Sequence, residues 1–240
     1  MDKQVRCSVV MATYNGELYI EEQIDSVLKN LDEDDELIIS DDGSSDGTRA
    51  IVHSYIEKDS RIQLVDGPQK GVIKNFENGL KCAKGEIIFL CDQDDIWTDN
   101  KVETVYSVMS DESTKLVMHD AVVVQDGHEI YASFMNHRGS KLGLFHNVLK
   151  NSYIGCCMAF KRELLQYILP FPEKICMHDQ WIGLIGEMTG KNVFISDKLI
   201  SYRRHENNAS TMKGLSVLKK IKNRYYMLTE LKRAKKKRKL

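Results

Sequence analysis

Short apolar runs alternate with longer amphipathic segments through the first half of the chain. The apolar runs occupy residues 5–12, 36–41, 61–66 and 86–92. Between them, apolar side chains recur at helical spacing in residues 17–31, 47–58 and 71–85. This alternation is typical of β-α-β crossovers, which build a parallel sheet covered by helices on both faces. The pattern therefore predicts a doubly wound α/β unit.

The pattern changes after residue 114. Two strand-like runs within residues 115–134 surround Asp126-Gly127, a dipeptide typical of tight hairpin turns. Residues 156–161 and 192–204 predict further strands, with a helix at about 179–189 between them. We expect one domain over residues 1–214, with a nucleotide-binding half at about 1–114 and an acceptor half at about 115–214. Residues 215–240 form a separate basic, amphipathic tail.

Three predicted strands end in unusual polar sequences. These are TYNG at 13–16, SDDGSSDGT at 40–48 and CDQDD at 91–95. Ligands of such sheets bind beyond the carboxyl ends of the strands, so we expect Asp42 to lie beside Asp92 and Asp94 in one crevice. The alternative for Asp41 and Asp42 is a structural one, since Asp, Ser and Gly also begin tight turns.

Carboxylates crowded in a crevice need protons or a cation at neutral pH. Their hard oxygen ligands suit Mg²⁺ or Mn²⁺, and such an ion usually completes its shell with phosphate oxygens and water. This chemistry predicts a nucleotide diphosphate substrate. A dehydrogenase or an ATPase is disfavoured, because neither G-x-G-x-x-G after the first strand nor G-x-x-x-x-G-K-[ST] occurs.

Charge is distributed unevenly over the 240 residues. Residues 219–240 hold eleven Lys or Arg against Glu230, so the preceding residues carry a net charge of −11, since the whole chain sums to −1. An apolar stripe of Leu218, Ile221, Tyr225 and Leu228 lies at helical spacing within this basic segment. Such a helix suits an anionic membrane surface. The alternatives are a solvated tail or an RNA-binding patch, although the acidic body argues against nucleic acid as a partner.

The compartment is predicted from two further features. Neither a signal peptide nor a membrane span is visible in the sequence. Six cysteines lie mostly in apolar runs without a C-x-x-C pair, which favours reduced core residues. We therefore expect a cytoplasmic protein, held peripherally at the inner face of the cell membrane by its basic tail.

Five motifs resemble a known family in order and spacing. They are SVVMATYNG, ISDDGSSDGT, GEIIFLCDQDDIW, MHDQW and YRRHENNAS, and together they cover about residues 5–210. They resemble the family 2 glycosyltransferases, which are inverting enzymes with the GT-A fold. The resemblance implies a Rossmann-like, mostly parallel sheet, a nucleotide-sugar donor and a divalent metal.

The resemblance also implies a role for each matching residue. Asp179 would be the general base, although the family often has Glu before it and this chain has His178. Asp94 and His205 would hold the metal. The nucleotide and donor sugar would be bound by Thr13, Tyr14, Asp42, Asp92, Gly155, Arg203 and Arg204. Asp95 would brace the loop, and Trp97 and Trp181 would either stack on a sugar or belong to the core.

The sequences DQDDIW and YRRHENNAS are most similar to those of bacterial transferases that build rhamnose-containing surface polysaccharides. It implies a dTDP-rhamnose donor and a growing glycan, lipid-linked, as the acceptor. Two alternatives stay open: a UDP-hexose transferase, and a non-catalytic, membrane-associated module that binds sugar nucleotides. The second would keep Asp92 and Asp94 but lose the base, so Asp179 argues against it.

Overall fold

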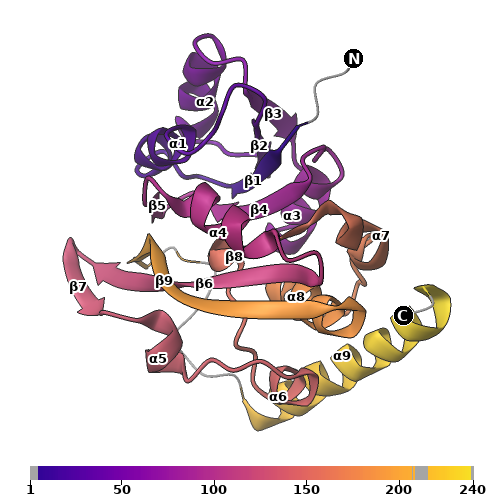
Figure 1. Cartoon of the computed structure of the whole chain (residues 1–240). Helices are drawn as coiled ribbons and strands as arrows, with labels where there is room; N and C mark the ends of the chain where they lie inside the picture. The colour runs from indigo at the N-terminus through magenta and orange to yellow at the C-terminus, as the bar shows by residue number, and fades with distance from the viewer. Residues whose placement is uncertain (1–4, 207, 209–215, 239–240) are drawn as a thin grey trace.

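The computed structural model describes residues 5–206, 208 and 216–238. Within these residues, nine strands form one sheet in the order β3-β2-β1-β4-β8-β6-β9-β5, with β7 paired to β6 (Figure 1). The chain thus has the predicted mixed α/β architecture. Helices flank the sheet, and a long helix, α9, follows it.

The first half folds as the alternating pattern predicts. Its strands pair in parallel and are β1 (Cys7–Thr13), β2 (Glu36–Asp41), β3 (Ile62–Asp66) and β4 (Ile87–Asp92). The helices between them are α1 (Ile20–Leu28), α2 (Thr48–Ile56) and α3 (Val72–Leu80). All seven residues of β1 are buried. Since successive side chains of a strand point to opposite faces, both faces of the sheet are covered at β1.

The second half contains the predicted hairpin. Strands β6 (Thr114–Gln125) and β7 (His128–Tyr131) flank Asp126 and Gly127, whose φ angles of 51° and 76° are those of a tight turn. The other predicted elements are present as β8 (Met158–Lys161), α8 (His178–Thr189) and β9 (Lys191–Arg204). Strand β8 pairs antiparallel with β4 on one side and with β6 on the other, so one sheet runs through both halves.

The short elements were not predicted. They are β5 (Ile96–Trp97), α4 (Lys101–Met109), α5 (Phe134–Arg138), α6 (Leu144–Leu149), η1 (Gly155–Cys157), η2 (Arg162–Leu164) and α7 (Leu165–Ile168). Only α4 carries a clear signal, because its buried residues Val102, Val105 and Met109 recur at helical spacing. The others have fewer residues than a periodic pattern needs.

The two tryptophans, whose roles the sequence left undecided, and most of the cysteines belong to the core. Trp97 and Trp181 are both buried, and the indole of Trp181 donates a hydrogen bond to the carbonyl oxygen of Ile168 at 3.0 Å. All six cysteines have free thiols, and four of them are buried. The two tryptophans therefore fill the interior rather than a sugar site.

Helix α9 (Val217–Arg238) packs against the body by one face (Figure 1). Met227, Leu231 and Ala234 are buried, and the Arg224 guanidinium donates to the carbonyl oxygen of Leu149 at 2.7 Å. The predicted helix is thus present and docked rather than solvated on all sides. None of the helices in residues 5–206 and 216–238 combines the length and apolar character needed to span a bilayer.

Candidate active site

The three polar strand ends meet at one edge of the sheet. Thr13 lies opposite Asp41 in the β1–β2 ladder, and Ala12 lies opposite Asp92 in the β1–β4 ladder. The loops that follow β1, β2 and β4 are therefore neighbours. This parallel register brings residues from three separated motifs together, as the sequence predicts.

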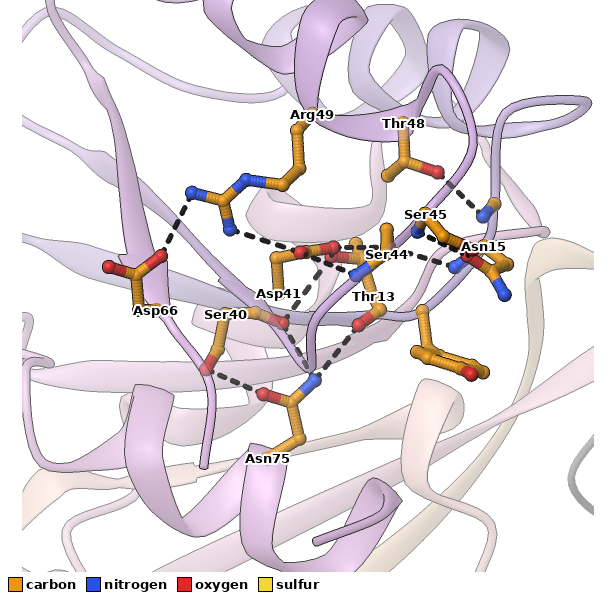
Figure 2. Close-up of polar contacts among 12 residues, drawn as sticks. Thr13, Asn15, Ser40, Asp41, Ser44, Ser45, Thr48, Arg49, Asp66 and Asn75 are labelled. Carbon is orange, nitrogen blue, oxygen red and sulfur yellow. Dashed lines mark hydrogen bonds and ion pairs between the residues drawn. The ribbon is translucent and has the colours of Figure 1, made fainter. Parts of the chain in front are cut away.

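Asp41 holds the first two loops together (Figure 2). Its side chain is 1% exposed and accepts hydrogen bonds from the Thr13 hydroxyl, the Ser44 amide and hydroxyl, and the Arg49 guanidinium. Burial alone would raise the pKa of this carboxyl, but the hydrogen bonds from Ser44, Arg49 and Thr13 outweigh it and lower the pKa below its usual value. Asp41 is thus an ionised structural anchor.

Replacing Asp41 by alanine is expected to lower the free energy of unfolding by about 2–3 kcal/mol, because several buried donors lose their acceptor. The measurement is urea unfolding at pH 7. Asp66→Ala is the matched control, since Asp66 bonds the same Arg49 at 2.8 Å but its side chain is 85% exposed. An equal loss in both variants would show that burial of Asp41 is not the cause.

The predicted base-binding residues differ in what their side chains do. The Thr13 hydroxyl faces Asp41, and the Asp42 carboxylate accepts hydrogen bonds from the backbone of Gly71 at 2.7 Å and of Lys70 at 3.3 Å. Asp42 therefore tethers the loop after β3. Tyr14, by contrast, is 59% exposed, so its ring is accessible at the strand end.

Residues without a predicted role connect the loops. The Gln93 side chain accepts from the Tyr14 amide at 2.9 Å and donates to the Tyr14 carbonyl oxygen at 3.1 Å. Asn15 has a φ angle of 48° and links to the β2 loop, where its amide donates to Ser44 and its side chain accepts from Ser45 (Figure 2). Both residues lie inside the polar motifs TYNG and CDQDD, and this position is the only feature of the sequence that could have predicted their role in joining the loops.

Asp94 and Asp95 are the buried members of the acidic cluster, and Asp92 is half-buried. Burial, followed by the charges of Asp94, Asp95 and Asp179, raises the pKa of Asp92 well above its usual value. No described residue donates a hydrogen bond to the Asp92 carboxylate. Asp95 accepts from the backbone amide of Arg203 at 3.0 Å, which fits the bracing role expected for it. Its second oxygen is buried without a partner among the described residues, and burial with the Asp94 charge raises its pKa to about 7.

The two predicted metal ligands are in contact. The Asp94 carboxylate lies 2.7 Å from Nε2 of His205 and also accepts from the Asn208 side chain at 3.1 Å. The His205 ring stacks on Tyr19 with a centroid distance of 4.6 Å. The C-terminal motif is thus folded over the acidic loop.

A hard divalent cation fits this donor set. Ligand atoms of Asp92, Asp95 and Cys156 lie within 4.8 Å of one another, and Asp94 is next to Asp95 in the same loop. Burial raises the pKa of the Cys156 thiol well above its usual value, and hard divalent cations prefer oxygen ligands to sulfur. The unpartnered carboxylate oxygens remain, and these suit Mg²⁺ or Mn²⁺.

The two arginines predicted to bind the donor have partners within the protein. Arg203 pairs with Glu22 at 2.7 Å and lies over the Tyr19 ring, 5.1 Å from its centroid. The Arg204 guanidinium donates to the Tyr202 hydroxyl at 3.1 Å. To bind a diphosphate, either arginine would have to give up these contacts or make them at the same time.

Asp179, the predicted base, is on the first turn of α8. It is 7% exposed, and its Oδ1 accepts from the Gln180 amide and, at 3.3 Å, from the Asn151 side chain. No described residue donates to Oδ2. Burial raises the pKa of Asp179 to about 7 against these hydrogen bonds, and its charge in turn contributes to the raised pKa of Asp92. A Cβ atom at Gly155 would lie 3.9 Å from Cβ of Asp179, and ligand atoms of the next residue, Cys156, and of Asp92 lie within 4.8 Å of each other. Asp179 is therefore close to the acidic loop.

Gly155 lies directly against His178. A Cβ atom at Gly155 would be 2.9 Å from Nε2 of His178, so glycine leaves room for the imidazole. The His178 ring stacks on Phe76 at 4.2 Å, and burial lowers its pKa to about 3. The histidine that departs from the family pattern is therefore a neutral, buried residue next to Asp179.

The chain is similar to known glycosyltransferases in sequence and in fold. The model of the family described as glycosyl transferase family 2 matches residues 8–169. The UDP-Glc:alpha-D-GlcNAc-diphosphoundecaprenol beta-1,3-glucosyltransferase WfgD of Escherichia coli is 30% identical over 209 residues, which are 86% of this chain and 80% of that protein. The dTDP-rhamnosyl transferase RfbG of Shigella flexneri is 29% identical over 218 residues, which are 82% of this chain and 72% of that one.

A solved structure shares the fold. The crystal structure of S. aureus TarS 1–349 in complex with UDP-GlcNAc superimposes with a TM-score of 0.71 at 20% sequence identity. The match covers 88% of this chain and 62% of the TarS chain. The chain therefore spans less than two thirds of that neighbour's length.

Proposed function

The chain belongs to glycosyl transferase family 2, and from this premise we propose that it transfers a sugar, with inversion, from a nucleotide-diphosphate sugar to a hydroxyl of a growing surface glycan. One observation carries the proposal. A buried carboxylate, Asp179, whose pKa is raised to about 7, lies close to the acidic loop at the joined ends of β1, β2 and β4. Single displacement at an anomeric carbon needs a base and a positive charge that stabilises the departing diphosphate. Asp179 would supply the first, and a cation held at the acidic loop would supply the second.

In this proposal, Asp179 takes the proton of the acceptor hydroxyl at Oδ2. Asn151 and the Gln180 amide hold Oδ1, so the carboxylate is oriented with its other oxygen available. A pKa near neutrality suits a general base, because the group is then partly ionised and still basic. Inversion follows from a single in-line step.

Asp94 and His205 would hold Mg²⁺ or Mn²⁺ on the other side of the donor sugar, with Asp92 nearer the ribose or the sugar itself. When bound, the cation stabilises the negative charge of the departing diphosphate. The separation from Asp179 is part of the proposal, because a carboxylate that ligated the cation would lose proton affinity. Tyr14, at the strand end, would border the nucleotide base, with Thr13 and Asp42 holding the surrounding loops. Gly155 would adjoin the donor sugar beside His178.

The donor proposed first is dTDP-rhamnose, and the alternative is a UDP-hexose. The relatives support both, since RfbG is named a dTDP-rhamnosyl transferase and WfgD a transferase for UDP-Glc. WfgD is named for transfer to a diphosphoundecaprenol-linked sugar, and this name supports a lipid-linked acceptor here as well. With such an acceptor, the enzyme would work in the cytoplasm at the inner face of the cell membrane.

The test is a screen of nucleotide sugars with the purified protein. Release of dTDP or UDP is measured with Mn²⁺, with Mg²⁺ and with a chelator. The proposal expects metal-dependent release from one donor class and an inverted product by NMR. Binding of nucleotide sugars without turnover under every condition, acceptors included, would favour the non-catalytic module instead. A product of retained configuration would contradict single displacement.

The pH dependence of kcat/KM is expected to follow Asp179. Its pKa is raised to about 7, so activity should be low at pH 5, rise about tenfold per unit below pH 7 and level off above it. The measurement is the initial rate of nucleotide release at limiting donor between pH 5 and 9. A rate that is constant from pH 5 to 9 would mean that no group with this pKa acts as the base.

A further inference from the structure

Large exposed apolar side chains gather on two neighbouring helices. Helix α6 exposes Leu144, Phe145 and Leu149, and Phe145 has 78% of its surface accessible. On α9 the exposed residues include Leu218, Ile221 and Tyr225. We refer to these six side chains as the α6–α9 surface. Six large apolar side chains exposed on two helices in contact are uncommon on a protein that acts alone in water.

The two helices are held together, so the surface has a defined shape. The Arg224 guanidinium donates two hydrogen bonds to the carbonyl oxygen of Leu149, at 2.7 and 3.1 Å. The opposite face of α9 is buried through Met227, Leu231 and Ala234. Figure 1 shows α6 and the first half of α9 side by side at one end of the molecule. The apolar stripe of α9 is therefore the outward face of a docked helix.

Positive charge predominates around the α6–α9 surface, and the acidic Glu187 beside α6 is bonded to the Gly143 amide and the Asn147 side chain. Exposed Lys141 and Lys150 flank α6, and Lys222, Lys232 and Lys236 lie along the outward side of α9. Residues 138–150 and 216–238 contain a single acidic residue, Glu230, which pairs with Arg233 at 2.7 Å. Because the rest of the chain is strongly acidic, this is the face that a negatively charged partner would approach.

We propose that the α6–α9 surface docks on an anionic bilayer, with Phe145 inserted among the lipids and the lysines at the head groups. Apolar anchors within a cationic rim are the chemistry that such an interface binds. A symmetric dimer would place the same cationic patch against itself, so a second copy is disfavoured by repulsion. This inference rests on the proposed lipid-linked acceptor and adds α6 to the membrane attachment expected of the C-terminal segment.

The same surface would orient the active site. The carbonyl oxygen of Asn147, in α6, accepts from the Gln180 side chain at 2.7 Å, and Asn151, two residues after α6, donates to Asp179. The segment that docks on lipid is thus bonded directly to the turn that carries the base. A hydroxyl presented from the membrane would reach the side of the site where Asp179 lies.

Phe145→Ser tests the inference through co-sedimentation with vesicles of phosphatidylcholine and phosphatidylglycerol in a 3:1 ratio. Burying a Phe side chain stabilises by about 1.5–3 kcal/mol, so the variant should bind at least about tenfold more weakly. Ile130→Ser is the matched control, since Ile130 is an exposed apolar residue on β7, outside the α6–α9 surface. Its vesicle affinity should equal that of the unchanged protein. Thermal unfolding of both variants checks that each is folded.

Two further measurements separate the possible occupants. Phe145→Trp should show a blue shift of its emission with these vesicles, as insertion requires. Equal sedimentation of Phe145→Ser and the unchanged protein, or equal binding to vesicles of phosphatidylcholine alone, would overturn the proposal. If light scattering showed a dimer of the unchanged protein and a monomer of Phe145→Ser, the surface would bind a second copy, and the membrane proposal would be overturned too. Vesicle binding needs no donor, so it can succeed even where the screen of nucleotide sugars fails.

Discussion

Asp179→Asn is expected to lower kcat by about 10² or more while the donor binds nearly as tightly as before. The amide keeps the size of the side chain and can still meet Gln180 and Asn151, but it cannot take the proton of the acceptor hydroxyl. The measurement combines steady-state rates with donor affinity by calorimetry. Glu173→Gln is the matched control, because Glu173 is an exposed carboxylate in the loop before α8.

Asp179→Asn should be more stable than the unchanged protein at high pH, although it is less active. Burial raises the pKa of Asp179 to about 7, so the folded state favours the protonated form and is destabilised as the pH rises from about 4 through 7. Removing the ionisable group removes this cost. The variant should therefore unfold at a higher temperature than the unchanged protein at pH 8, and at a similar one at pH 4. Turnover within a few-fold of the unchanged enzyme would mean that another residue is the base.

Asp94→Ala is expected to abolish transfer and the metal-dependent part of nucleotide binding. The substitution removes one proposed ligand and the partner of a second, since Asp94 lies 2.7 Å from His205. A divalent ion contributes several kcal/mol to stabilising a developing negative charge, so the loss of activity should exceed about 10³-fold. The measurement is calorimetry of UDP and dTDP binding with Mn²⁺ and with a chelator.

Asp99→Ala is the control for this variant. Asp99 is exposed and lies five residues further along the same loop region, so its loss changes the local charge without removing a proposed ligand. Nucleotide binding by Asp99→Ala should keep its dependence on Mn²⁺. If Asp94→Ala also kept that dependence, the assignment of Asp94 to the cation would be wrong.

The sequence by itself determined the alternation of strands and helices and the position of the chemistry. Local patterns carry this information, because a buried strand such as β4 needs an uninterrupted apolar run and a polar motif must follow where the strand ends. The hairpin at Asp126 and Gly127 was equally local, since few residues adopt its backbone angles. Helix α6 was not visible, because six residues are too few to show a period.

Only the tertiary structure decided how each polar residue is used. Asp41 and Asp42 are adjacent in sequence, yet parallel pairing turns Asp41 toward Thr13 and Arg49 and turns Asp42 toward Gly71. Asp94 and His205 are 111 positions apart, and folding of the last motif over the acidic loop brings them into contact. The spacing along α9 identified an apolar stripe, but packing against the body decided that Met227 and Leu231 are buried and Ile221 is not. Local propensity selects the elements, whereas contacts between distant segments select which faces and charges remain available for function.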